Sequence, residues 1–279
     1  MATPLGYDVF ISDPIAQNAT ESLPNGDRPM WSPLSTTLIH GDKDAVLVDP
    51  PFTRDQAHAV ANWLQAGNKN LTHIFVTHGH GDHWFTAGLL AERFGAQITA
   101  TLGTIDQMHR NVALRGVVWD RLFPGQIPET TVTAVAPPNN RLELEGHPLD
   151  IVEVGHTDTD ATTVLHVPDL TLVVAGDAIY NGVHPYLAES ANGGRDKWRS
   201  AIDIVETLKP RWIVAGHKNK DLDDSAKRTI SETREYLDTA DQLLAQQSTA
   251  VGFFNAMLDR YPDRLNPGAL WIGATALYR

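Results

Sequence analysis

The stretch "VTHGHGDHWF", residues 76–85, constrains this chain more than any other, because it places three histidines and an aspartate within six positions. These residues are His78, His80, Asp82 and His83. Crowded imidazoles repel one another once they are protonated, and a bound cation removes the need for those protons. Neutral imidazole and carboxylate are ligands that suit Zn²⁺. The stretch therefore predicts a metal site.

The position of this motif predicts how its side chains are arranged. The short apolar run "HIFVTH" is typical of a buried strand, which would deliver His78 at its C-terminal end. His78 and His80, two positions apart on a turn, can point at one metal centre. Asp82 and His83, further round the turn, can point at a second centre beside it. Each centre needs further ligands, which must come from elsewhere in the chain.

Three further candidate ligands follow apolar runs: His156 after "EVG", Asp177 after "VVAG" and His217 after "IVAG". Loops at strand ends commonly build functional sites. A carboxylate can bridge two metals, so Asp177 alone could serve both centres. The alternative reading, a solvated His and Asp loop on a glycine turn, does not account for three more candidates at strand ends.

The rest of the chain predicts alternating strands and helices in two similar halves. Hairpins are expected at 35–51, 142–156 and 162–177, further strands at 96–101 and 211–217, and a turn-rich loop at 18–29. Helical periodicity is expected at 84–95, in pieces within 103–131, and at 197–209, 222–246 and 249–260, followed by an apolar tail at 268–279. These halves predict an α/β fold with a sheet-on-sheet core, outer helices and a site along one edge.

Composition excludes several classes of function. The formal net charge of −12 argues against nucleic acid or an acidic membrane as partner, because phosphate binding is driven by clustered Lys and Arg. The absence of cysteine excludes disulfides, thiolate metal sites and cysteine nucleophiles. The N-terminus lacks the pattern of a secretory signal, and no apolar run reaches the ~20 residues of a membrane span. We expect a single domain over residues 1–279, in the cytoplasm.

The motif H-x-H-x-D-H at 78–83, followed in order by His156, Asp177 and His217, resembles the metallo-β-lactamase superfamily of metallohydrolases. The resemblance implies a four-layer αββα sandwich, with two packed mixed sheets flanked by helices, and two zinc ions per chain. It implies that one metal is bound by His78, His80 and His156, the other by Asp82, His83 and His217, with Asp177 bridging both. It also implies that Asp49, at the end of "VLVD", orients ligands from behind.

The resemblance further implies hydrolysis by a metal-bridging hydroxide, with Asp82 able to pass a proton to the leaving group. The bridging Asp177 speaks against true β-lactamases, which generally lack that carboxylate. Tyr180, three residues after Asp177, has the spacing found in N-acyl homoserine lactone lactonases, and its phenol could contact the substrate carbonyl or oxyanion. The favoured function is therefore cleavage of a small organic ester, lactone or amide.

Other functions and contacts remain open at this stage. The alternatives are a phosphodiesterase or organophosphate hydrolase, a sulfur dioxygenase relative with one iron, and a degenerate member without catalysis. Tyr180, His184 and Trp84 are candidate substrate-binding residues. Other aromatic side chains could wall an apolar pocket; these are Trp31, Phe52, Trp119, Phe123 and Tyr186. We expect a small-molecule substrate, no nucleic acid and no membrane partner, and leave a homodimer open.

Overall fold

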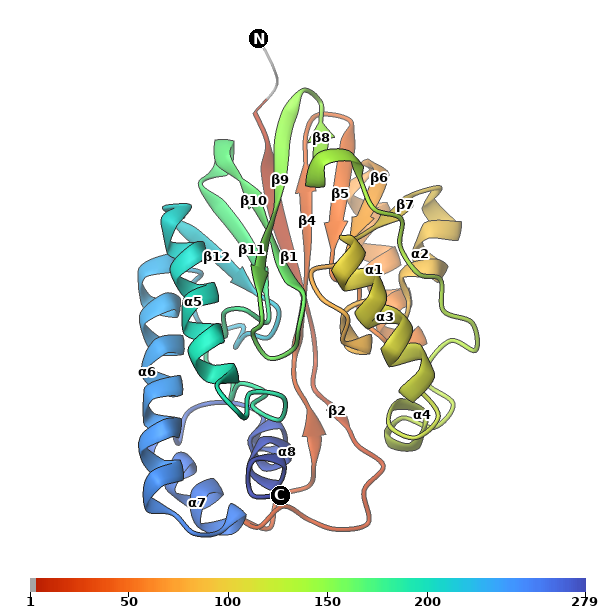
Figure 1. Ribbon diagram of the computed structural model, residues 1–279. Coiled ribbons are helices and arrows are strands. Elements are labelled where there is room, and N and C mark those ends of the chain that lie inside the picture. The colour runs from red at the N-terminus through yellow and green to blue at the C-terminus, as the bar shows by residue number, and fades with distance from the viewer. Residues whose placement is uncertain (1–3) are drawn as a thin grey trace.

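The computed structural model describes residues 4–279, and its centre is a pair of β-sheets packed against each other (Figure 1). Within those residues the strands form two five-stranded sheets and a two-stranded ribbon. The first sheet contains, in spatial order, β1 (Gly6–Ser12), β4 (Leu34–His40), β5 (Asp44–Val48), β6 (Asn70–Phe75) and β7 (Gln97–Thr99). The second contains β12 (Trp212–Ala215), β11 (Leu172–Gly176), β10 (Thr162–Val167), β9 (His147–Gly155) and β8 (Arg141–Leu144). The ribbon is formed by β2 (Ile15–Ala16) and β3 (Met30–Trp31).

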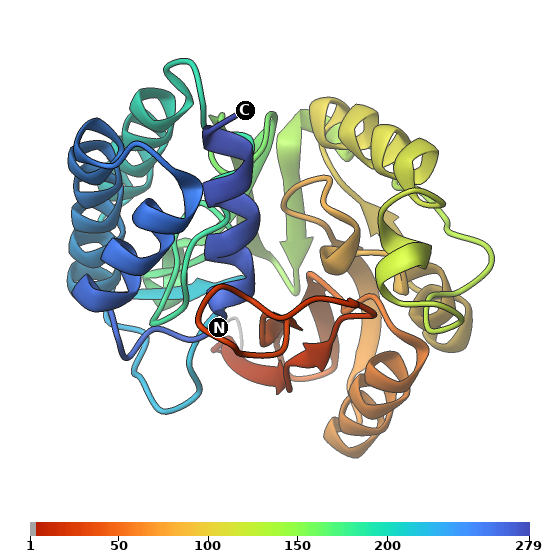
Figure 2. The same ribbon diagram turned by 90° about the horizontal axis from the view of Figure 1, so that it is seen from below.

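Helices cover the outer face of each sheet, which completes the expected αββα sandwich. The first sheet is flanked by α1 (Arg54–Gly67), α2 (Ala87–Phe94), α3 (Leu102–Leu114) and α4 (Trp119–Leu122). The second is flanked by α5 (Gly194–Thr207), α6 (Ala226–Gln246), α7 (Ala250–Arg260) and α8 (Pro267–Leu277). Short 3₁₀ turns are η1 (Gly81–His83), η2 (Pro138–Asn140) and η3 (Pro168–Leu170). Seen from below, α8 crosses the molecule beside the loop that carries the ribbon (Figure 2).

The apolar strand residues explain the layering. Side chains of both sheets meet in one central cluster, in which Val46, Val48 and Phe75 of the first sheet join Leu165 and Val174 of the second. The opposite faces of the sheets pack on the helices in two further clusters. Strands buried on both faces need continuous apolar runs, which is the pattern of "AVLV" and "LVVAG".

Parallel pairing brings the polar strand ends to one edge. β5 pairs in parallel with β6, and β11 with β12. Backbone bonds join the two sheets at that edge: Ser35 N–H donates to Gly216 O (2.7 Å), and Thr163 N–H donates to Thr77 O (2.9 Å). The residues that follow these strands are therefore neighbours in space.

Most predicted elements are confirmed. The three hairpins are β4–β5, β8–β9 and β10–β11, and α2 ends at Gly95 in the left-handed conformation. The predicted apolar tail is the helix α8, which begins with Pro267 after the capping side chain of Asn266. Among residues 4–279, no helix is both long and apolar enough to cross a bilayer.

Candidate metal centre

The H-x-H-x-D-H motif leaves the end of β6 and folds back through η1, so that its polar side chains face the junction of the two sheets. Glycine makes this tight turn possible: a Cβ on Gly81 would lie 2.2 Å from the ring of Phe85. Trp84 anchors the turn from behind, since its indole N–H donates to Gly79 O (3.0 Å) and its side chain is fully buried.

The first candidate group contains His78, His80 and Asp158. The Oδ2 atom of Asp158 lies 2.9 Å from His80 Nδ1 and 3.8 Å from His78 Nε2. His78 and Asp158 are fully buried. Asp158 was not predicted from the sequence. The one signal that could have pointed to it is the pair of aspartates in the loop "HTDTD", which follows a strand.

The second candidate group contains Asp82, His83 and His217. His217 Nε2 lies 3.3 Å from Asp82 Oδ2, and His83 Nε2 lies 3.8 Å from the same oxygen. Asp177 faces both histidines, because its Oδ1 is 3.4 Å from His83 Nε2 and its Oδ2 is 3.4 Å from His217 Nε2. The rings of His78 and His83 are 4.2 Å apart, so the two groups adjoin.

Each of the four clustered histidines has its other ring nitrogen held by the protein. The bonds join His78 Nδ1 to Thr77 Oγ1 (3.0 Å), His80 Nε2 to Glu189 Oε1 (3.0 Å), His83 Nδ1 to Asp49 Oδ2 (3.2 Å) and His217 Nδ1 to Pro33 O (2.9 Å). Such bonds orient a ring and leave the second nitrogen for a metal. The free nitrogens are those that face the two groups.

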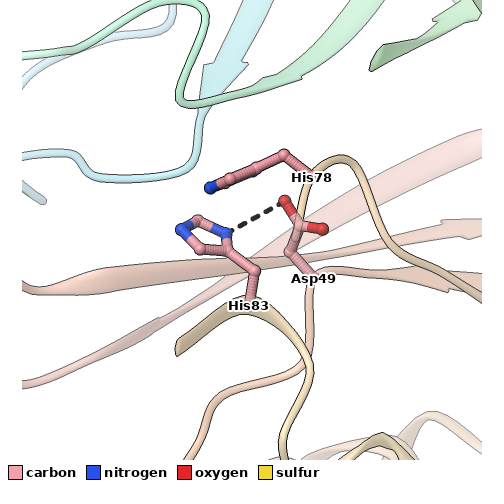
Figure 3. A group of neighbouring side chains, drawn as sticks. All are labelled: Asp49, His78 and His83. Atoms are coloured by element: carbon pink, nitrogen blue, oxygen red, sulfur yellow. Dashed lines mark hydrogen bonds and ion pairs between the residues drawn. The ribbon is translucent and has the colours of Figure 1, made fainter. Parts of the chain in front are cut away.

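Asp49 lies beside His83 and is bonded to it (Figure 3). Its Oδ1 accepts from Thr77 N–H (2.9 Å), and its Oδ2 accepts from Thr77 Oγ1–H (2.7 Å) and from His83. Both oxygens are therefore committed to protein donors. Although Asp49, His78 and His83 lie close enough to hold an ion, these bonds make Asp49 an orienting residue.

The residues present fit a pair of divalent cations. Within residues 4–279, several buried atoms of the two groups and of Asp177 have no hydrogen-bond partner: Nε2 of His78 and His83, Oδ2 of Asp158 and Oδ1 of Asp177. Unpaired buried polar atoms are costly, and a pair of cations would satisfy all of them together. Imidazole and carboxylate form a donor set suited to first-row divalent metals.

The electrostatics of the groups point the same way. Burial raises the pKa of Asp82, but His83 and His217 outweigh it and hold that pKa well below its usual range. Burial lowers the pKa of His83, but Asp177, Asp82 and Asp49 outweigh it and raise that pKa to about 10. Burial raises the pKa of Asp177 to about 6, although His217 and His83 oppose it. Without metal, protons on histidine compensate the buried carboxylates.

A cavity of about 150 Å³ opens above the groups. Its polar floor includes His80, Asp82, Asp177 and His217, and its apolar wall is formed by Trp31, Leu114, Val118, Trp119, Ala269 and Ile272. Tyr180 lines it and donates its phenol proton to Asp177 Oδ2 (2.6 Å). Tyr186 lines it with its ring nearly perpendicular to that of His80. Trp31 donates its indole N–H to Asp82 Oδ2 (2.8 Å), a contact not anticipated from the sequence.

Five residues that the sequence suggested for the site lie elsewhere. Within the described chain, His156 belongs to neither group; its Nδ1 bonds Asp160 Oδ1 (2.7 Å) and its Nε2 faces the start of α5. His184 is fully buried and bonds Tyr236 OH (2.9 Å), since its segment packs under α6. Trp84 is buried in the core cluster formed by the first sheet and its helices, as are Phe52 and Phe123 of the expected pocket wall. The substrate-binding roles expected of His184 and Trp84 do not fit these positions, and His156 as a metal ligand stays a prediction.

Two lysines, Lys218 and Lys220, follow His217 in the sequence. Lys218 is buried and paired with Asp224 (2.5 Å), so its ammonium is committed to that carboxylate. Lys220 is exposed. In the described chain, neither lines the cavity.

Comparison with known proteins gives a consistent result. A family model described as the metallo-beta-lactamase superfamily matches residues 30–217. A hydroxyacylglutathione hydrolase of Rhizobium meliloti (strain 1021) is 31% identical over 134 residues, which are 48% of this chain and 42% of that protein. This chain therefore spans less than half of that relative. A UPF0173 metal-dependent hydrolase of Staphylothermus marinus is 25% identical over 185 residues, which are 66% of this chain and 77% of that protein.

Solved structures agree in fold. A metallo-beta-lactamase family protein from Thermus thermophilus superposes with a TM-score of 0.62 at 19% identity, covering 96% of this chain and 91% of that one. The chain shares this fold and carries two groups of residues that could hold metal ions. Since the family model covers more than half of its length, the chain belongs to the metallo-beta-lactamase superfamily.

Proposed function

We propose that this chain is a dinuclear zinc hydrolase that cleaves a small, uncharged ester, lactone or amide. The observation that carries the proposal is the convergence of two ligand groups, His78–His80–Asp158 and Asp82–His83–His217, on the floor of one cavity. When bound, two divalent cations lower the pKa of water from 15.7 toward ~7 and polarise a carbonyl oxygen.

The protein's own side chains supply position and charge. Asp177 faces His83 and His217 of the second group through separate oxygens, so it could serve that centre, and its role as a bridge to the first centre stays a prediction. Tyr180 fixes one of these oxygens by donating its proton to it. A tyrosine has a single donor, so contact with a substrate carbonyl requires this bond to open. The low pKa of Asp82 favours an anionic ligand, and its role as proton carrier stays a prediction.

The cavity lining favours a neutral substrate over a phosphodiester. None of its lining residues in the described chain is Lys or Arg, the side chains that usually meet phosphate charge. Its apolar wall, including Leu114, Val118 and Trp119, suits a hydrocarbon portion of the substrate. A volume of about 150 Å³ suits a small molecule. A thioester is the nearest variant, because one relative carries the name hydroxyacylglutathione hydrolase.

The test combines metal analysis with a substrate panel. We expect about two zinc ions per chain and turnover of lactones, esters or amides above thioesters and phosphodiesters. His80→Ala and Asp177→Ala should each abolish turnover and lower metal content, because each removes a facing ligand. Turnover of phosphodiesters alone, or one iron per chain, would overturn the proposal in favour of a phosphodiesterase or a sulfur dioxygenase relative. A cytoplasmic location, a single domain and a homodimer remain predictions.

A further inference from the structure

We propose that the phenol of Tyr186 donates a hydrogen bond to the carbonyl oxygen of the substrate and is therefore a catalytic residue. This inference rests on the proposed function, because it requires a substrate that contains a carbonyl group. From the sequence, Tyr186 was expected only in the apolar wall of the pocket, and Tyr180 was the phenol expected to contact the substrate.

The neighbours of Tyr186 in the sequence hold it in place at the cavity. His184 is fully buried, and its ring bonds Tyr236 OH (2.9 Å). Leu187 is also fully buried and packs against α8, where a Cβ on Gly273 would lie 3.1 Å from the Leu187 Cβ. Tyr186 lies between these two buried residues, is itself only partly buried, and lines the cavity. The segment therefore presents one aromatic ring to the site in a fixed position.

The ring of Tyr186 lies beside the first ligand group. Its centroid is 5.4 Å from that of His80, and the two rings are nearly perpendicular at 85°. The other phenol of the cavity, Tyr180, stacks on His217 of the second group, with centroids 5.9 Å apart. Each ligand group thus has one tyrosine beside it. A carbonyl oxygen held on the side of the first group would meet Tyr186.

The phenol oxygen of Tyr186 is free, unlike the other neutral polar groups that line the cavity. In the part of the chain that the structure describes, this oxygen makes no hydrogen bond, and it is not among the unpaired atoms that are fully buried, so solvent reaches it. The other hydroxyl, amide and indole groups of the lining all take part in hydrogen bonds within the protein; these belong to Trp31, Ser32, Asn111, Trp119, Tyr180 and Asn266. Tyr186 is therefore able to bond a substrate without first breaking a bond to the protein.

A phenol in this position suits the charge change in the hydrolysis of an ester, lactone or amide. When the oxygen of water adds to the carbonyl carbon, an electron pair of the C=O bond moves onto the carbonyl oxygen, which becomes negative. A tyrosine is protonated at neutral pH, and its hydrogen bond to this oxygen strengthens as the charge develops. The proton stays on Tyr186 throughout, so the phenol is unchanged when the product leaves.

Asp82 indicates which oxygen of the substrate meets Tyr186. It is the predicted proton carrier to the leaving group, and it belongs to the second ligand group together with His217. A leaving group near Asp82 leaves the side of the first group, where His80 and Tyr186 lie, for the carbonyl oxygen.

The Tyr186→Phe variant tests the inference, because it removes the hydroxyl and keeps the ring. Since that hydroxyl has no partner within residues 4–279, zinc content and Tm should match those of the wild type. We expect kcat for the best substrate of the panel to fall by about 10²- to 10³-fold, the effect of removing one oxyanion donor, with little change in KM. Tyr278→Phe is the control, because its phenol bonds Gln247 O outside the cavity.

Two further measurements distinguish contact with the carbonyl from other roles. In a series of aryl esters of one acid that differ only in the leaving group, the loss in kcat should be similar for every ester, because the carbonyl oxygen is common to all. Phenylboronic acid takes up hydroxide to form a tetrahedral anion. In calorimetry it should bind the zinc-loaded variant more weakly than the zinc-loaded wild type.

The outcomes separate the inference from the proposed function. The inference is overturned by an unchanged kcat, by a loss that shrinks as the leaving group improves, or by equal affinity for phenylboronic acid. A fall in zinc content or Tm also overturns it, since Tyr186 would then act through the structure. In each of these cases, hydrolysis by the wild type leaves the proposed function standing. A wild type that hydrolyses no ester, lactone or amide overturns both.

Discussion

Removal of one oxygen atom from Tyr180 isolates the role of its phenol. In the Tyr180→Phe variant the ring keeps its contacts, since it stacks on His217 with centroids 5.9 Å apart and lies 6.0 Å from Trp198. The bond lost is the one to Asp177 Oδ2, 2.6 Å long and fully buried. A hydrogen bond to a charged acceptor contributes about 1.5–3 kcal/mol. At about 1.36 kcal/mol per factor of ten, this corresponds to a loss of about 10- to 150-fold.

We expect that loss in kcat/KM, with metal content unchanged at saturating zinc, because Tyr180 is not itself in a ligand group. The assay measures steady-state hydrolysis of the best substrate of the panel, together with zinc content and thermal unfolding. Tyr278→Phe is the control, since its phenol donates to Gln247 O (2.9 Å) outside the cavity. An unchanged rate would refute the reasoning and remove Tyr180 from the site.

Two further perturbations address the ligand groups directly. Gly216→Ala should weaken metal binding, because the new Cβ would lie 2.4 Å from Asp177 Oδ1 and 2.8 Å from His83 Cε1. Gly67→Ala is the control and should not weaken it, because no atom lies within 4 Å of the added Cβ. Equal zinc affinities of the two variants would contradict this expectation. Zinc binding at pH 7 should release at least one proton, because the pKa of His83 is raised to about 10 in the metal-free protein and a ligating imidazole must be neutral. Zinc affinity should therefore fall as the pH falls. Calorimetry in buffers of different ionisation enthalpy counts the protons released when zinc binds. Release of no proton would exclude a protonated His83 in the metal-free protein.

Much of the fold followed from local pattern. The hairpins at β4–β5 and β10–β11 and the helix α2 were predictable because apolar runs, turn residues and Gly95 act over a few neighbouring positions. The H-x-H-x-D-H motif could likewise be recognised as a cluster of candidate metal ligands, because its four polar side chains share one short turn. The role of α8 could not be predicted, because its uniformly apolar sequence does not show which side of the helix is buried. Only the folded chain places it beside the ribbon and over the cavity.

The sequence by itself determined the layers, the strand ends at which polar groups gather, and five of the six residues in the two ligand groups. Only the tertiary structure decided that Asp158 faces His80 while His156 turns toward α5. It also decided that His184 packs under α6 and that Tyr180 bonds Asp177. The reason is physical: a strand end sets where a loop begins, but the direction of each side chain within the loop depends on hydrogen bonds to residues far away in the chain, such as Glu189 and Thr104.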